Sequence, residues 1–146
     1  MNYSKKSLGQ NFLIDKNIIQ KILNQSKIEN KHILEIGPGN GELTDEILRG
    51  NPSSITLIEK DFKLTKILKE KYSKYKNIKI FNNDILKVNI EGLLEKNTII
   101  FGNLPYNVSS QILVKFIRFK KWPPRYLDLI FMFQKELGEK IMGLYK

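Results

Sequence analysis

The sequence predicts an α/β fold in which a mostly parallel sheet is flanked by helices. Segments with the apolar period of a helix alternate with short runs rich in β-branched residues, and this alternation is typical of βαβ units with right-handed crossovers. The chain also lacks internal repeats, low-complexity tracts and linkers, so we expect one domain. The five expected strands cover residues 32–36, 54–58, 77–81, 97–101 and 127–133.

The composition limits what the protein can be. With 146 residues, 41% of them hydrophobic, the chain is long enough for one sizeable core. The 25 lysines and arginines outnumber the 15 acids, which gives a net charge of +10 and favours a polyanionic partner such as a nucleic acid, with a solvated lysine-rich surface as the alternative. The absence of cysteine excludes disulfides and cysteine-ligated zinc, and we expect no metal. Without a long apolar run or a signal peptide, we expect a soluble, cytoplasmic protein that binds no membrane.

The first expected helix covers residues 15–25, and the first strand follows it. Asp15 is a suitable N-cap because its carboxylate can accept bonds from the free N–H groups of the first turn. The strand at 32–36 contains the single histidine, His32, which we interpret as a strand residue rather than a catalyst or ligand. Four apolar residues of the helix are expected to face the core: Ile18, Ile19, Ile22 and Leu23.

Two more helices are predicted by apolar stripes at helical spacing. Lysines occupy the other faces of the first, whereas Ser109 and Ser110 are candidate caps for the second. The first stripe consists of Leu64, Ile67, Leu68, Tyr72 and Tyr75, and the second of Val108, Ile112, Leu113, Phe116 and Ile117.

A glycine-rich turn follows the first strand in the segment EIGPGNGELT, residues 35–44. Ligands of parallel sheets bind outside the carboxyl ends of the strands. Gly37, Gly39 and Gly41 would let the backbone turn sharply and approach a ligand without a Cβ in the way. The spacing differs from the G-x-G-x-x-G of a dinucleotide site, because residue 42 is glutamate. A purely structural turn is the alternative.

Two acids follow the next two strands. Glu59 ends the second strand, where a carboxylate can accept both hydroxyls of a ribose, and Asp84 follows the third, where it could accept from an adenine amino group. Each alone could be an ordinary acid in a turn or at a strand end. The glycine turn and both acids, in this order, fit an adenosyl ligand that has no pyrophosphate.

Asn-Leu-Pro-Tyr, residues 103–106, follows the fourth strand. Together the motifs resemble class I S-adenosylmethionine-dependent methyltransferases, which carry E-x-G-x-G-x-G, an acid after the second strand and an aspartate after the third. Members that methylate exocyclic amino groups carry [DNS]-[PIL]-P-[YFW] at this position. Three further segments resemble the ribosomal RNA adenine dimethyltransferases: GQNFL (9–13), GNLPYNVSS (102–110) and FMFQKELGEKI (131–141). This resemblance covers essentially the whole chain.

The resemblance implies a role for each residue of this tetrad. The side-chain oxygen of Asn103 and the backbone carbonyl of Leu104 would accept from the two hydrogens of adenine N6 and favour a more pyramidal nitrogen. Pro105 restricts the backbone and so holds the Leu104 carbonyl in place. Tyr106 offers a face on which the target base can stack. Because the sulfonium donor is already activated, the protein mainly aligns the reactants, and Asn103 would also contact the cofactor.

Other residues acquire roles only through the resemblance and the charge. Asn11 and Leu13 match family positions that close over the cofactor, S-adenosyl-L-methionine. A group of basic residues provides candidates for RNA phosphate contacts, with surface solvation as the alternative for each: Lys5, Lys6, Lys115, Arg118, Lys120, Lys121 and Arg125.

Within the family, the chain resembles most the bacterial enzymes that dimethylate two adjacent adenosines in a 16S rRNA hairpin loop. The resemblance then implies a monomer that acts on 16S rRNA in a pre-30S subunit during ribosome biogenesis. Pro38 and Leu104 favour this branch over the 23S rRNA methyltransferases of the macrolide-resistance type. Two further hypotheses are an amino-methyltransferase that acts on DNA or another RNA, and a non-catalytic ribosome-assembly or RNA-binding factor.

The resemblance also suggests that the chain is incomplete. Family members continue through further strands and then a C-terminal helical domain. We therefore expect residues 1–146 to form a Rossmann-like class I methyltransferase domain that lacks its final strands and the helical domain.

Overall fold

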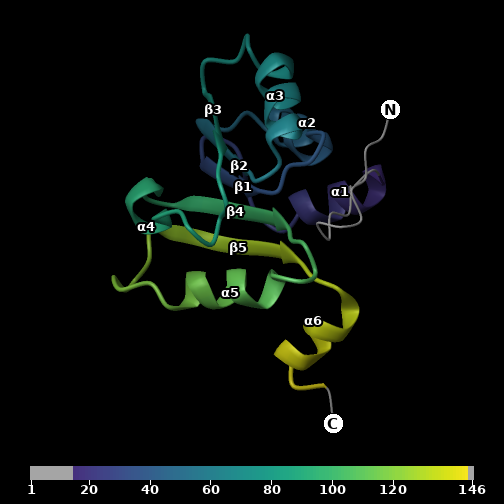
Figure 1. Cartoon of the computed structure of the whole chain (residues 1–146), viewed down its shortest axis with the longest axis vertical. Helices are drawn as coiled ribbons and strands as arrows, with labels where there is room; N and C mark the ends of the chain where they lie inside the picture. The colour runs from purple at the N-terminus through teal and green to yellow at the C-terminus, as the bar shows by residue number, and fades with distance from the viewer. Residues whose placement is uncertain (1–14, 145–146) are drawn as a thin grey trace.

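The computed structural model describes residues 15–144 and contains one five-stranded sheet of order β3-β2-β1-β4-β5 (Figure 1). All neighbouring strands pair in parallel, which confirms the predicted fold. The strands are β1 (His32–Ile36), β2 (Ser54–Glu59), β3 (Ile78–Asn82), β4 (Thr98–Asn103) and β5 (Tyr126–Met132). The helices are α1 (Lys16–Leu23), α2 (Glu42–Arg49), α3 (Phe62–Lys71), α4 (Ile90–Leu93), α5 (Ser109–Ile117) and α6 (Lys135–Ile141).

The sheet separates two apolar clusters, because successive side chains of a strand point to opposite faces. Ile33 of β1 packs with apolar residues of α1, α2 and α3, whereas its neighbour Leu34 packs with residues of α4 and α5. The central residues of β1, β2 and β4 are buried on both faces, as expected for a parallel sheet covered by helices. Figure 1 shows α5 on the face of β4 and β5 opposite to α2 and α3.

The chain changes sides after β3. The β1–α2–β2 and β2–α3–β3 units extend the sheet in one direction, whereas β4 pairs with the other edge of β1 and β5 follows it. β1 and β4 are therefore the neighbours at which the strand order reverses. In open α/β sheets this switch point leaves a crevice at the carboxyl ends of the strands, where ligands bind.

Of the two predicted helix caps, one is confirmed and the other is wrong. Asp15 caps α1 and accepts from the amides of Asn17 and Ile18 at 2.8 and 3.4 Å. The prediction that Ser109 or Ser110 caps α5 is wrong, since the N-cap position is Val108 and makes no side-chain cap bond. Both serines lie inside the first turn of the helix.

Some residues of the apolar stripes are exposed rather than buried. The prediction that Ile18 faces the core is wrong. Three members of the other two stripes are also exposed: Ile67, Tyr75 and Ile117. A helix that packs against a sheet buries one face only. In each of these helices, other apolar residues of the stripe occupy that face. Tyr75 also lies beyond the end of α3 at Lys71, so the helical period no longer sets its direction. His32 is a strand residue, as predicted, and its Nδ1 lies 2.7 Å from the Ser54 hydroxyl.

Candidate active site

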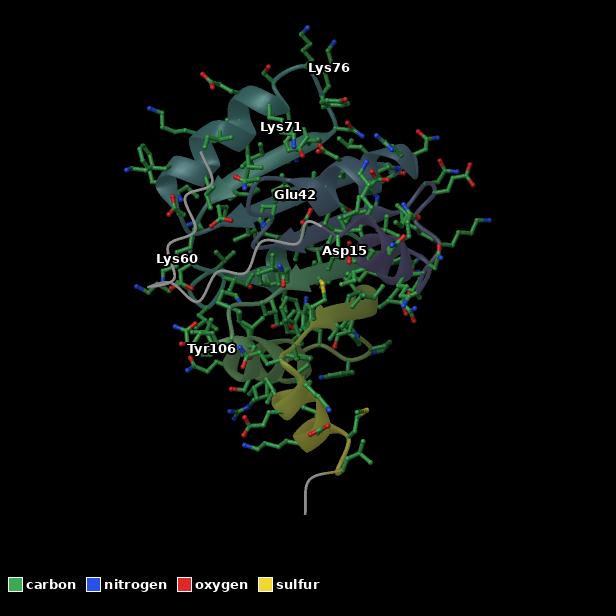
Figure 2. All side chains as sticks on the ribbon, turned by 90° about the vertical axis from the view of Figure 1, so that its right-hand side faces the viewer. Asp15, Glu42, Lys60, Lys71, Lys76 and Tyr106 are labelled. Carbon is green, nitrogen blue, oxygen red and sulfur yellow. The ribbon has the colours of Figure 1, made fainter. Side chains whose placement is uncertain are left out.

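A cleft of about 120 Å³ opens at the carboxyl ends of β1, β2, β3 and β4. Figure 2 looks from the side to which β4 and β5 point in Figure 1, with Lys60 and Tyr106 on the same side of the molecule. The cleft brings together most of the residues predicted from the sequence. Six of them line it: Gly37, Gly39, Glu59, Asp84, Asn103 and Pro105.

Gly37 stands where the first and fourth strands meet. It has a φ of +66°, which favours glycine, and its amide donates to the Ile58 carbonyl at 3.0 Å. A Cβ at this position would lie 3.4 Å from the backbone oxygen of Asn103. The glycine turn therefore contacts the start of the Asn-Leu-Pro-Tyr segment without an intervening side chain.

The far end of the glycine turn is held by the last turn of α3. The Tyr72 hydroxyl lies 3.0 Å from the Gly41 carbonyl and 2.7 Å from Asp45 Oδ1. Lys71 Nζ donates to the Asn40 carbonyl at 3.0 Å and to Asp45 Oδ2 at 2.7 Å. Tyr72 is only 4% exposed, and burial together with its bond to Asp45 raises the pKa of its hydroxyl above the ordinary range. We call these four side-chain contacts the α3 clamp.

Glu35 lies beneath the glycine turn as a fully buried acid. Its side chain is 2% exposed, and its Oε2 accepts from the Thr44 hydroxyl at 2.6 Å. Burial raises the pKa of Glu35 to about 8; the Thr44 bond opposes this rise, and the carboxylates of Glu42, Glu59 and Asp45 add to it. Glu35 thus binds a proton more readily than an ordinary glutamate.

Glu59 closes the second strand with its carboxylate aimed at the glycine turn. The side chain is 2% exposed and accepts from the amides of Gly39 at 3.3 Å and Asp61 at 2.9 Å. Burial raises the pKa of Glu59, and the charge of Asp61 adds to this rise, whereas the backbone amides of Asp61, Gly39 and Lys60 oppose it. A carboxylate has about four lone-pair directions, so the side chain keeps acceptor capacity for a ligand.

Asp84 lies across the cleft from the glycine turn. Its Oδ1 accepts from the Leu86 amide at 3.0 Å, and Lys60 Nζ lies 3.2 Å from its Oδ2. Burial by itself would raise the pKa of Asp84, but the Leu86 amide and the charge of Lys60 outweigh it, so the pKa lies below its ordinary value. The side chain is therefore an ionised acceptor at the cleft wall.

The backbone of the Asn-Leu-Pro-Tyr segment has an uneven pattern of hydrogen bonds. The Pro105 carbonyl accepts from the Val108 amide at 3.1 Å, and the Tyr106 carbonyl accepts from the Ser109 hydroxyl at 3.1 Å. No hydrogen bond among residues 15–144 ends on the Leu104 carbonyl. Among the described residues, this carbonyl therefore keeps its acceptor capacity unused.

The side chains of the same segment point in different directions. Asn103 and Pro105 line the cleft. Leu104 is buried, and its methyl group lies so close to Gly102 that a Cβ there would be 2.6 Å away. Tyr106 is 57% exposed and does not line the cleft. Its ring is available on the molecular surface next to the cleft.

Sequence reasoning missed the apolar wall of the cleft and one of its cations. Ile58 and Ile85 line it next to the two acids, together with Ile112 of α5 and the side chain of Lys60. The signal was present for two of them, because Ile58 precedes Glu59 and Ile85 follows Asp84 directly. Nothing in the sequence pairs Ile112 with them, since α5 reaches the cleft only through the fold.

Four of the predicted residues lie outside the described residues: Asn11, Leu13, Lys5 and Lys6. Among the basic candidates farther along the chain, the guanidinium of Arg125 donates to the Leu94 carbonyl at 3.2 Å. Within residues 15–144, no helix is long and apolar enough to cross a membrane, and no three acidic or histidine side chains are grouped so that they could hold a metal ion.

Sequence comparison identifies a family for the whole chain. The family model described as "Ribosomal RNA adenine dimethylase" matches residues 1–146. Two bacterial proteins named "Ribosomal RNA small subunit methyltransferase A" are similar to the chain: that of Pelagibacter ubique is 46% identical over 140 residues, and that of Sulfurihydrogenibium sp. is 43% identical over 146 residues. The alignments cover 96% and 95% of this chain but 53% and 54% of those proteins. The chain thus spans about half the length of the curated relatives it matches.

Comparison with solved structures gives the same fold. The 23S rRNA methyltransferase ErmE superimposes with a TM-score of 0.79 at 29% identity, over 92% of this chain and 52% of that one. A dimethyladenosine transferase from Plasmodium falciparum has a TM-score of 0.76 at 28% identity, over 90% and 46% of the two chains. The described sheet and helices are thus a Rossmann-like methyltransferase fold.

Proposed function

Because the chain belongs to the ribosomal RNA adenine dimethylase family, we propose that it forms the reaction centre of an rRNA adenine N6-methyltransferase. The methyl donor is S-adenosyl-L-methionine, and the acceptor is the exocyclic N6 of adenines in 16S rRNA. The observation that supports this most is the single cleft in which Glu59, Asp84 and Asn103 meet the glycine turn.

The residues present fit an adenosyl cofactor. The Glu59 carboxylate at the cleft wall suits the ribose hydroxyls, and the ionised Asp84 suits the adenine amino group. Ile58, Ile85 and the backbone at Gly37 provide an apolar slot that a larger side chain at residue 37 would narrow. When bound, the cofactor supplies an electrophilic methyl group on sulfur. Asn11 and Leu13, which lie outside the described residues, remain candidates to close over it.

The remaining residues act on the target base. The Leu104 carbonyl and the Asn103 side chain would accept from the two hydrogens of N6, which orients the nitrogen lone pair toward the methyl group. The hydrogen bonds from N6 to these two acceptors would strengthen as the nitrogen becomes pyramidal. The two groups would therefore stabilise the transition state more than the ground state. Tyr106 would stack on a base that has left its helix, which favours a loop adenine over one in a duplex.

Among the candidate substrates, we favour small-subunit rRNA. The curated relatives at 43–46% identity are named for the small subunit, whereas ErmE, named for 23S rRNA, is 29% identical. We propose dimethylation of two adjacent adenosines of 16S rRNA in a pre-30S subunit, by a monomer in the cytoplasm. The 23S rRNA alternative is less favoured.

Single-turnover kinetics at saturating cofactor and RNA test this function. We expect Asn103→Ala to slow methyl transfer at least about tenfold, because it removes an acceptor that the transition state needs. Tyr106→Ala should remove about 1–3 kcal/mol of stacking free energy between the ring and the target base. Tyr106→Phe keeps an aromatic ring and should retain most of this free energy. The assay uses both this chain and a form extended to the length of its relatives. Nucleoside mass spectrometry identifies the methylated product.

Two outcomes would contradict the proposal. Wild-type rates in both alanine variants would mean that the segment is only a turn. RNA binding without any methyl transfer, even by the extended form, would favour a non-catalytic assembly factor.

A further inference from the structure

A second groove lies beside the cleft, on the face of the sheet that α4 and α5 cover. The segment after Asp84 forms one wall with Leu86 and Val88, and the outer face of α5 forms the other with Gln111 and Lys115. Leu86 lines both the cleft and this groove. The two hollows are thus neighbours that share one wall.

Three cations line the groove: Lys115, Arg118 and Lys120. The single carboxylate that lines it, Glu91, accepts from the backbone amide of Lys121 at 3.1 Å. Within residues 15–144, neither the Arg118 guanidinium nor the Lys120 ammonium takes part in a hydrogen bond or ion pair. Their charges are therefore available to an external anion.

Lys115 plays a different part. Its Nζ donates to the Val88 carbonyl at 2.6 Å and so ties α5 to the opposite wall. Partial burial lowers the pKa of this ammonium, although the charge of Asp84 opposes the change. Lys115 thus holds the groove in shape, whereas Arg118 and Lys120 extend from it.

We propose that this groove binds the phosphate backbone of the RNA strand that carries the target adenine. The inference rests on the proposed function. α5 begins three residues after Tyr106 and runs away from the carboxyl ends of the strands. At a rise of 1.5 Å per residue, Arg118 lies about 14 Å from the start of the helix. A strand with one base in the cleft can pass along the shared wall at Leu86 and bring its neighbouring phosphates to Arg118 and Lys120.

The test measures the affinity of the chain for a fluorescent adenine-containing RNA hairpin at several salt concentrations. Arg118→Ala/Lys120→Ala is compared with Lys74→Ala/Lys76→Ala, which removes the same charge from exposed positions between α3 and β3. We expect the groove variant to raise Kd about tenfold at low salt. The slope of log K against log salt should fall by about 1.4, since each phosphate contact on a single strand contributes about 0.7. The control variant should keep the wild-type slope.

Calorimetry with S-adenosyl-L-methionine separates this proposal from the proposed function. The groove variant should bind the cofactor as the wild type does. Equal RNA affinities and slopes for the groove and control variants would overturn the groove while leaving the function intact. Failure of the wild type to bind the hairpin at low salt would overturn both.

Discussion

Glu35 and Glu59 are both buried carboxyls at the ends of neighbouring strands, but their partners differ. Glu59 accepts from two amides of the backbone, which stabilise its ionised form. Glu35 has a single hydroxyl partner, Thr44, and other carboxylates nearby. We infer that Glu59 serves as an acceptor for a ligand, whereas Glu35 supports the turn from below as a group that holds its proton.

We expect stability to depend on pH through Glu35. The folded chain raises the pKa of this acid from 4.5 to about 8, so between these values the folded state binds a proton that the unfolded state has lost. The free energy of unfolding therefore falls as pH rises through this window, by about 1.4 kcal/mol per pH unit for one group. Urea denaturation from pH 5 to 8 should show this loss for the wild type.

The matched variant is Glu35→Gln, which keeps an acceptor for Thr44 but cannot ionise. It should remove the share of the slope that Glu35 contributes and leave that of Glu59, whose pKa burial also raises. An unchanged slope in this variant would assign the pH dependence to other groups.

Glu59 should affect cofactor affinity. Glu59→Gln removes the charge and one acceptor oxygen, and hydrogen bonds to charged groups contribute about 1.5–3 kcal/mol. We expect calorimetry to show S-adenosyl-L-methionine binding weakened by roughly tenfold to 150-fold. Glu70→Gln, on an exposed position of α3, is the control and should bind as the wild type does. Equal affinity of both variants would exclude Glu59 as a ribose acceptor.

At the scale of elements, α3 is connected to the glycine turn by the α3 clamp. Removing the Tyr72 hydroxyl in Tyr72→Phe should cost about 1 kcal/mol of stability, in the range for one hydrogen bond. If the clamp positions the turn, affinity for the cofactor should also fall about three- to tenfold. A purely structural role would lower the melting temperature and leave the Kd of the folded protein unchanged. Tyr75→Phe is the control, because Tyr75 is half exposed and contacts Tyr72 edge-on.

The sequence predicted the elements better than their details. Each expected strand lies within two residues of an observed one, because runs such as 32–36 are too short and too β-branched for a helix. The positions of Glu59 and Asp84 at one edge followed from the parallel order of the strands. Ile18 and Ile117 belong to predicted apolar stripes but are exposed. The period of a helix does not reveal how wide a face of the helix the sheet covers. Contacts between distant elements, such as Tyr72 with Gly41, have no signal in the sequence.

At the scale of the whole molecule, the cleft is built from four strand ends, so a ligand there is bound by the folded sheet only. Ligands that bind the native state alone stabilise it by RT ln(1 + [L]/Kd), about 2.7 kcal/mol at 100 times Kd. For a domain of this size we expect the melting temperature to rise about 5–10 °C with S-adenosyl-L-methionine. Differential scanning fluorimetry checks this, and at the same ligand concentration Glu59→Gln should show a much smaller rise. A rise of equal size in both proteins would place the ligand elsewhere.

The contact between Gly37 and the Asn103 backbone joins two motifs that lie far apart in the sequence. The Cβ of any side chain introduced at residue 37 would touch the backbone oxygen of Asn103, in addition to straining a backbone with positive φ. Neighbouring substitutions of this kind do not have additive effects. The two motifs should therefore evolve as one unit, in which the history of changes at one loop decides which mutations the other tolerates.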